Sequence, residues 1–306
     1  MKRRFFKAEA LEHVYQRAAN RGVIFYSELD FLMYLTILGV TAHKYRVRII
    51  SICLMVDHVH LLIEAETYQD LYKFIQDCTS QFALEFNYSI GRSGSLWQRP
   101  YGMALKKGDK AKRTAIAYVN NNGVEKDLAK RTEDYRWNLL KYYNCTHPFS
   151  VPIGSSTPSR AMGKALSLVR MQHALNRPLG YPLLVKLFSK LNEGERRQLG
   201  DKIVSLYNPI DYKTAISYYK DYESMLIALN SNTGSEYDLH EEYSQSSDLA
   251  YPKITEYIKD RLRLRNPRSV IMVPADQRSV LLSEITNLGI ATEHQARKYL
   301  HLPLSR

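Results

Sequence analysis

Two apolar segments joined by only two residues are the feature that most constrains the fold. Segments 46–55 and 58–64 are rich in β-branched and apolar residues, and Val56-Asp57 connects them. Segments of this composition form strands, and strands joined by so short a connection pair as an antiparallel hairpin. The sequence therefore predicts an antiparallel sheet that contains this hairpin.

Strand and helix signals alternate on both sides of the hairpin. Ser27 with Asp30, and Thr67 with Asp70, have the spacing of residues that cap the start of a helix. The expected elements are a strand at 13–18, a helix from Ser27 through Leu38, a helix from Thr67 that is broken by 87–94, a strand at 95–105 and a helix at 110–122 ended by Gly123. This order predicts an α+β fold, in which helices cover an antiparallel sheet.

Residues 144–158 have the composition of a linker, with three prolines, Gly154 and three serines. We place a domain boundary there, between residues 1–143 and an α-helical accessory domain at 159–306. The helical segments expected in the second part are 159–175, 181–191, 193–207, 211–230 and 254–264, and polar residues 231–247 are expected to form a loop.

The C-terminal region has the outline of a helix-turn-helix at 276–301. A helix at 276–287 is followed by the turn 288–291, and Thr292 with Gln295 caps a second helix. We interpret it as an accessory DNA-binding or hairpin-recognition element, with a helical scaffold or an oligomerisation domain as the alternative. The side chains expected to be exposed on it are His294, Arg297, Lys298 and His301.

The charge of the chain favours a polyanionic partner. The formal net charge is +12, which attracts nucleic acid, although a generally basic protein without such a ligand has the same composition. Three widely spaced cysteines indicate a reducing compartment, and no apolar stretch approaches the length of a membrane span. The N-terminal residues lack the apolar core of a signal peptide, so we expect a cytoplasmic protein without a membrane partner.

Two histidines in the second hairpin strand are candidate metal ligands. His58 and His60 are two residues apart, so both imidazoles project from one face of the strand. The pair alone does not distinguish zinc, manganese or a structural role.

Tyr118 and Asn122 lie one turn apart on the expected helix at 110–122. The helix can therefore present a phenol nucleophile and an amide oxygen to one site, and a tyrosyl ester conserves the energy needed to rejoin a cut strand. The alternatives are an ordinary core tyrosine among the 23 in the chain, and a polar residue near a helix end.

Four linked motifs carry a resemblance to a known family. They are Leu54-Met55-Val56-Asp57-His58-Val59-His60-Leu61-Leu62-Ile63-Glu64, Gly94-Ser95-Leu96-Trp97-Gln98-Arg99-Pro100-Tyr101, Ala117-Tyr118-Val119-Asn120-Asn121-Asn122-Gly123-Val124 and Asp134-Tyr135-Arg136-Trp137. In this order they resemble the REP-associated tyrosine transposases of the HUH endonuclease superfamily, over about residues 13–143. The resemblance implies a ferredoxin-like antiparallel sheet, a Mg²⁺ or Mn²⁺ ion and a transient 5′-phosphotyrosine bond to single-stranded DNA.

The resemblance also assigns roles to residues. His58 and His60 match the paired histidines, Tyr118 matches the nucleophile and Asn122 matches the third metal ligand. Two positions depart from the family pattern, because Gly123 stands where the family usually has proline and Asp57 stands where it usually has asparagine. Neither departure removes a group that the chemistry needs.

The implied partner is single-stranded DNA with hairpins, of REP-like or element-end sequence, bound by a monomer or homodimer. Trp97 and Tyr101 are candidates for stacking on unpaired bases, with core packing as the alternative. The candidate phosphate contacts are Arg99, Lys110, Lys112 and Arg113.

Two alternatives to a DNA-nicking transposase stay open. A metal-dependent amidohydrolase or phosphoesterase also places a His-x-His after a strand, but it would need further histidines and an aspartate at later strand ends of a barrel. A domesticated DNA-binding protein would keep the fold without turnover, although all four expected catalytic positions are filled here.

Overall fold

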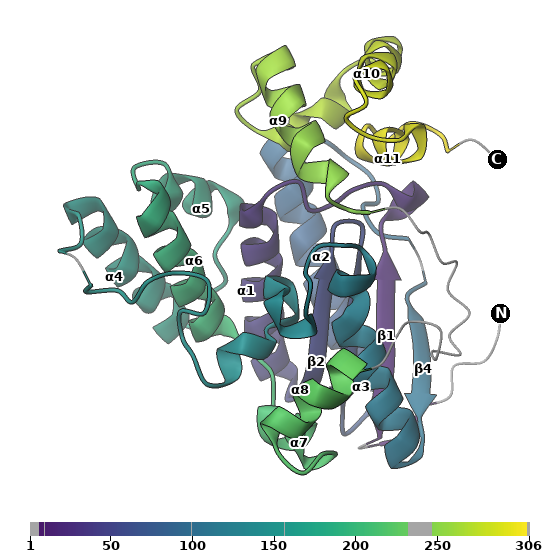
Figure 1. The fold of residues 1–306 in the computed structure, drawn as a ribbon, viewed down its shortest axis with the longest axis vertical. Helices are drawn as coiled ribbons and strands as arrows, with labels where there is room; N and C mark the ends of the chain where they lie inside the picture. The colour runs from purple at the N-terminus through teal and green to yellow at the C-terminus, as the bar shows by residue number, and fades with distance from the viewer. Residues whose placement is uncertain (1–5, 9, 99, 156, 232–246, 305–306) are drawn as a thin grey trace.

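A four-stranded antiparallel sheet forms the centre of the first half of the chain (Figure 1). The computed structural model describes residues 6–8, 10–98, 100–155, 157–231 and 247–304. The strands are β1 (Leu11–Arg17), β2 (Arg48–Met55), β3 (His58–Glu64) and β4 (Gly102–Lys106), in the order β2-β3-β1-β4. With a helix after β1 and another after β3, this is the ferredoxin-like arrangement that the motifs predicted, and the β2–β3 hairpin is confirmed.

Three helices accompany the sheet: α1 (Glu28–Tyr45), α2 (Tyr68–Ile90) and α3 (Gly108–Glu125). Both predicted caps are confirmed, because Ser27 and Asp30 form a capping box and the Thr67 hydroxyl accepts a hydrogen bond from the Asp70 amide at 3.1 Å. Helix α3 crosses the face of the sheet that is toward the viewer in Figure 1. It therefore covers one face of the strands that carry the candidate site.

Two predicted boundaries around α3 are wrong. Only Gly102–Lys106 of the expected strand at 95–105 pairs in the sheet, while Trp97 makes one isolated bridge to Ala18 and its ring turns into the core. Gly123 lies inside α3 instead of ending it. A Cβ there would stand 2.4 Å from the Tyr135 ring, so this position needs glycine for close packing.

The second half of the chain is helical, as predicted. Its expected segment 211–230 is two helices instead of one, because residues 218–221 interrupt it. The expected loop at 231–247 lies outside the described residues except at its two ends. The helices are α4 (Arg160–Ala174), α5 (Tyr181–Phe188), α6 (Glu193–Tyr207), α7 (Tyr212–Ser217), α8 (Tyr222–Ser231), α9 (Ala250–Leu262), α10 (Ala275–Asn287) and α11 (Glu293–Tyr299), with short 3-10 turns at Ala19–Arg21, Thr132–Asp134, Arg136–Asn138, Leu140–Tyr143 and Pro267–Met272.

The helices of the second half pack against the first half in two groups (Figure 1). Helices α4–α6 lie beside α1, and α9–α11 lie over one end of the sheet region. The segment predicted as a linker returns to α6, where the Phe149 amide and the Ser150 hydroxyl donate hydrogen bonds to Asp201 at 3.0 and 2.8 Å. Among the described helices, none has the length and hydropathy of a bilayer span.

A buried ion pair joins the C-terminal region to α1. The Arg268 Nε lies 2.6 Å from the Asp30 Oδ1, and both side chains are fully buried. The guanidinium also lies 3.4 Å from the centre of the Tyr181 ring and donates a hydrogen bond to the Ser89 hydroxyl at 2.9 Å. One side chain thus connects the C-terminal region with α1, α2 and α5.

Glu12 in β1 gives the fold a predictable pH dependence. It is fully buried, and burial raises its pKa to about 7, against the opposing effects of a Lys7 backbone hydrogen bond and the Lys106 charge. The folded state therefore disfavours the carboxylate, and this penalty grows as pH rises from the unfolded value of 4.5 through 7. Replacing Glu12 with Gln should stabilise the protein by about 3 kcal/mol at pH 8 and about 1 kcal/mol at pH 5.

Urea denaturation of Glu12→Gln at the two pH values measures this difference. Glu66→Gln, at an exposed position, is the matched control and should change stability at neither pH. An equal gain at pH 5 and pH 8 would show that the ionisation of Glu12 is not the cause.

Candidate active site

The two predicted metal-ligand histidines lie side by side on β3. His58 and His60 project from the same face, with ring centroids 4.8 Å apart and an edge-to-face orientation. Both side chains are buried. Their strand pairs with β2 on one side and β1 on the other. Both histidines therefore lie on an inner strand, whose backbone is held by hydrogen bonds on both sides.

A third histidine, His13 of β1, belongs to this cluster and was not predicted. Its Nε2 lies 3.0 Å from the Nδ1 of His60, and the two rings stack with centroids 5.2 Å apart. The sequence placed His13 in a strand, but only the pairing of Tyr15 with His60 brings it beside the histidine pair. His13 was not predicted because the sequence did not show that β1 and β3 are neighbours in the sheet.

Helix α3 brings Tyr118 to the same cluster. The Tyr118 ring meets His60 and His13 edge-on, with centroid separations of 5.4 and 5.7 Å, and it is 7% exposed. Asn122, one turn later, is also buried, and its Nδ2 donates a hydrogen bond to the Tyr118 carbonyl at 2.8 Å. The fold therefore gathers the predicted nucleophile and the histidine pair, which are 58 residues apart in the chain from His60 to Tyr118.

Burial keeps two of the imidazoles neutral. It lowers the pKa of His13 to about 3, with a smaller contribution from Lys106. It also lowers the pKa of His60 well below its ordinary value, and the neighbouring His58 and His13 act in the same direction. A neutral imidazole retains a nitrogen lone pair, which is the form that binds metals.

Asp57, at the turn between β2 and β3, contacts the Nδ1 side of the His58 ring. Its Oδ1 lies 2.5 Å from the His58 Nδ1, and its Oδ2 lies 2.5 Å from the Nζ of Lys298 in α11. Burial opposes ionisation of this carboxyl, but His58 and Lys298 outweigh it and hold the pKa of Asp57 well below its usual range. Asp57, which stands where the family usually has asparagine, thus places a negative charge beside His58, a candidate metal ligand.

Two imidazoles and an amide would be the ligands of a metal ion at this cluster. The Nδ1 atoms of His58 and His60 face Asp57 and His13, so Nε2 is the atom of each ring that would bind a metal. The amide nitrogen of Asn122 is used within α3, which leaves Oδ1 for a metal. In the part of the chain that the structure describes, no group of three or more His, Cys, Asp or Glu side chains is arranged to hold a metal.

The predicted DNA contacts fall into different environments. Trp97 is 4% exposed, and its Nε1 donates a hydrogen bond to the Thr79 carbonyl at 3.0 Å, so it packs in the core and is not available for base stacking. Tyr101 is also buried, whereas Lys110 and Arg113 are exposed near the start of α3. Lys112 lies 3.4 Å from the Tyr218 hydroxyl. Arg99 lies outside the described residues.

The C-terminal residues predicted to be exposed divide in the same way. The helix-turn-helix outline is present as α10 and α11, and His294 is exposed. Lys298 and His301 instead face the first half of the chain, where the His301 Nε2 lies 2.8 Å from the Val23 carbonyl oxygen. The expectation that these two side chains are exposed is wrong, because α11 docks on the sheet region.

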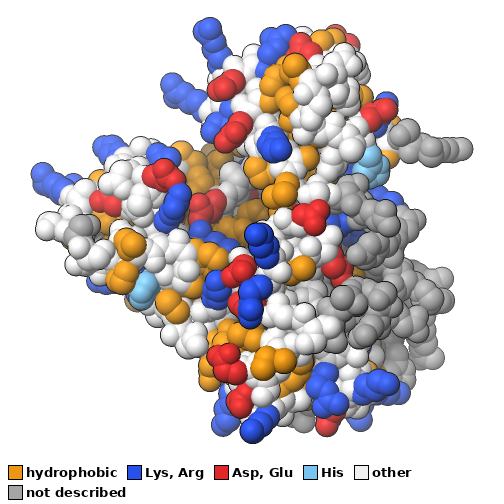
Figure 2. Space-filling view, viewed as in Figure 1, with side chains coloured by type: hydrophobic (Ala, Val, Ile, Leu, Met, Phe, Trp, Pro, Cys, Tyr) orange, Lys and Arg blue, Asp and Glu red, His pale blue; other side chains and the backbone are white. Residues whose placement is uncertain are grey.

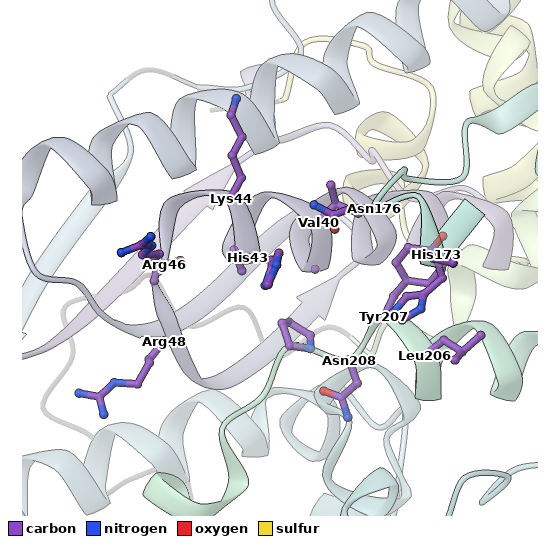
Figure 3. Close-up of a pocket in the computed structure, with 15 residues that line it drawn as sticks. Val40, His43, Lys44, Arg46, Arg48, His173, Asn176, Leu206, Tyr207 and Asn208 are labelled. Carbon is purple, nitrogen blue, oxygen red and sulfur yellow. The ribbon is translucent and has the colours of Figure 1, made fainter. Parts of the chain in front are cut away.

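A large groove lies away from this cluster (Figure 3). It has a volume of about 1000 Å³ and lies between the end of α1 and the ends of α4 and α6. Its basic side chains include Lys44, which pairs with Asp77, and Arg48, which pairs with Glu64. Among the described residues on the face shown in Figure 2, Lys and Arg side chains are interspersed with Asp and Glu.

The sequence of the first part of the chain matches a known family. Residues 9–122 match the family described as "Transposase IS200 like". This match confirms, at the level of that family, the resemblance that the four motifs carry. The open four-stranded sheet also rules out the barrel that the amidohydrolase alternative required.

One solved structure is similar, described as "Structure of the REP associates tyrosine transposase bound to a REP hairpin". The match has a TM-score of 0.38 and 17% sequence identity, and it covers 45% of this chain and 80% of the other. No curated protein sequence matches the chain.

Proposed function

We propose that this protein nicks single-stranded DNA that contains hairpins and transfers the cut strand through a covalent bond to Tyr118. The observation that carries the proposal is the convergence of Tyr118 from α3 with His60 and His13 from two adjacent strands. A phenol beside neutral imidazoles, in a domain of the IS200-like transposase family, has the groups that this chemistry needs.

The reaction would be a reversible exchange of phosphate esters. The Tyr118 hydroxyl gives up its proton and its oxygen bonds to phosphorus, the bond from phosphorus to the 3′ oxygen breaks, and the leaving 3′ oxygen takes up a proton. Attack by a 3′ hydroxyl on the tyrosyl ester then restores a phosphodiester and the phenol. A Mg²⁺ or Mn²⁺ ion held by His58, His60 and Asn122 would polarise the scissile phosphate.

The exposed start of α3 is the proposed path of the DNA backbone. Lys110 and Arg113 lie eight and five residues before Tyr118 on the same helix, so phosphates bound there lead toward the part of α3 that carries the nucleophile. Replacing both with Gln should weaken DNA binding at every sequence and reduce the slope of log affinity against log salt by about 2.

Fluorescence anisotropy over a range of salt concentrations measures this slope. Lys253→Gln, at an exposed position on α9, is the control and should leave the slope unchanged. An unchanged slope in the Lys110→Gln, Arg113→Gln double variant would place the DNA elsewhere.

Incubation with a labelled hairpin oligonucleotide and Mg²⁺ or Mn²⁺ tests the proposed function. A product that migrates with the protein on a denaturing gel, and that EDTA prevents, is the expected result. Hairpin binding without any cleavage would instead support the alternative of a domesticated DNA-binding protein.

A further inference from the structure

We infer that Lys298, in the last helix of the described chain, is a positioning residue of the active site. It holds the carboxylate that orients His58, so the C-terminal helices complete the metal-binding geometry of the first domain. This inference rests on the proposed function, because it assigns His58 as a metal ligand.

The carboxylate of Asp57 contacts both Lys298 and His58. The Lys298 Nζ and the His58 Nδ1 each lie 2.5 Å from a different oxygen of Asp57. The side chain of Lys298 is 15% exposed and that of Asp57 is 7% exposed, so solvent competes little for either charge. With both oxygens occupied, rotation of the carboxylate would break one of the two contacts.

Several other contacts fix the place of α11 on the sheet region. The Val23 amide donates a hydrogen bond to the Lys298 carbonyl at 3.1 Å, and the Ile24 and Phe25 amides donate to the Val56 carbonyl at 2.9 and 3.0 Å. The segment 23–25 therefore lies between α11 and the β2–β3 turn and binds both. Gly22 permits this approach, because a Cβ there would stand 2.6 Å from the His301 ring.

The consequence for His58 is a defined ring orientation. Ligand imidazoles commonly donate their second ring N–H to a carboxylate, which fixes the tautomer and aims the other nitrogen at the metal. Asp57 is placed to accept from Nδ1, so Nε2 faces the site. Loss of Lys298 leaves this carboxylate without the contact that stops it from rotating.

The affinity for Mn²⁺, measured by isothermal titration calorimetry on the full chain without DNA, tests the inference. We expect Lys298→Met to weaken Mn²⁺ binding by about 10-fold to 100-fold, the range found when outer-shell partners are lost. Lys298→Arg should restore most of the affinity, since it keeps the cation. Arg297→Met, on the same helix but paired with Glu293, should bind Mn²⁺ as the wild type does.

The outcomes separate the inference from the proposed function. No Mn²⁺ binding by the wild-type protein overturns the metal dependence, and the inference fails with it. Mn²⁺ binding by the wild type that is lost in His58→Ala but unchanged in a folded Lys298→Met overturns the inference alone. Nitrogen NMR of histidine-labelled wild-type protein needs no variant that could misfold. We expect a proton on Nδ1 of His58. A neutral ring with its proton on Nε2 would contradict the inference, because Nδ1 could not then donate to Asp57.

Discussion

Replacing Tyr118 with Phe is expected to abolish the covalent adduct with DNA and to lower cleavage at least 10³-fold, a loss of about 4 kcal/mol or more in transition-state stabilisation. The variant lacks only the phenolic oxygen, which we propose as the nucleophile. Its ring can still meet the edges of His60 and His13, so the site should remain packed. Hairpin DNA binding should therefore stay within about two-fold of the wild type.

Single-turnover cleavage and a denaturing gel measure the two effects. Tyr15→Phe is the matched control, because Tyr15 lies on the same face of β1 as His13, with ring centroids 5.7 Å apart. It should still form the adduct. An adduct that persists in Tyr118→Phe and disappears in Tyr15→Phe would show that the nucleophile has been assigned to the wrong tyrosine.

Replacing Arg268 with Met is expected to destabilise the protein by about 3–5 kcal/mol, the cost of leaving a buried charge without its partner. Asp30 would keep the hydrogen bonds from the Tyr26 and Ser27 amides but lose the cation 2.6 Å from its other oxygen. The stacking of the guanidinium on the Tyr181 ring would also be lost. Chemical denaturation of the wild type and the variant measures this loss.

The double variant Asp30→Asn, Arg268→Met separates charge from packing. It should recover part of the stability lost in Arg268→Met, because it no longer buries an unpaired carboxylate. Arg265→Met, at an exposed position nearby, should change stability by less than about 0.5 kcal/mol. A loss below about 1 kcal/mol in Arg268→Met would mean that the pair contributes little to folding.

Local signals predicted much of the fold from the sequence. The β2–β3 hairpin and the caps at Ser27 and Thr292 depend on residues close together in the chain, and the structure contains all three. The strand expected at 95–105 failed because its apolar residues also suit an irregular segment, in which Trp97 packs against Phe82 and Tyr34. Apolar composition indicates burial there, but it does not distinguish a strand from a buried loop.

Only those residues of the candidate site that lie within a sequence motif could be predicted. Tyr118, His58 and His60 came from spacing within a strand and from the family resemblance, and the structure gathers their rings. His13 and Lys298 had no such signal, since the first depends on which strands are neighbours and the second on how α11 docks. Lys298 and Asp57 are 241 residues apart, a separation that no local pattern spans.

The same separation sets an order of events during synthesis. At the usual rates of translation, about 5–20 residues per second, the ribosome adds Lys298 roughly 10–50 s after Asp57. The nascent chain thus carries His58, His60 and Tyr118 before Lys298 exists. We expect the proposed site to bind a metal ion about 10-fold to 100-fold more weakly in the growing polypeptide, until α11 has been made and has docked.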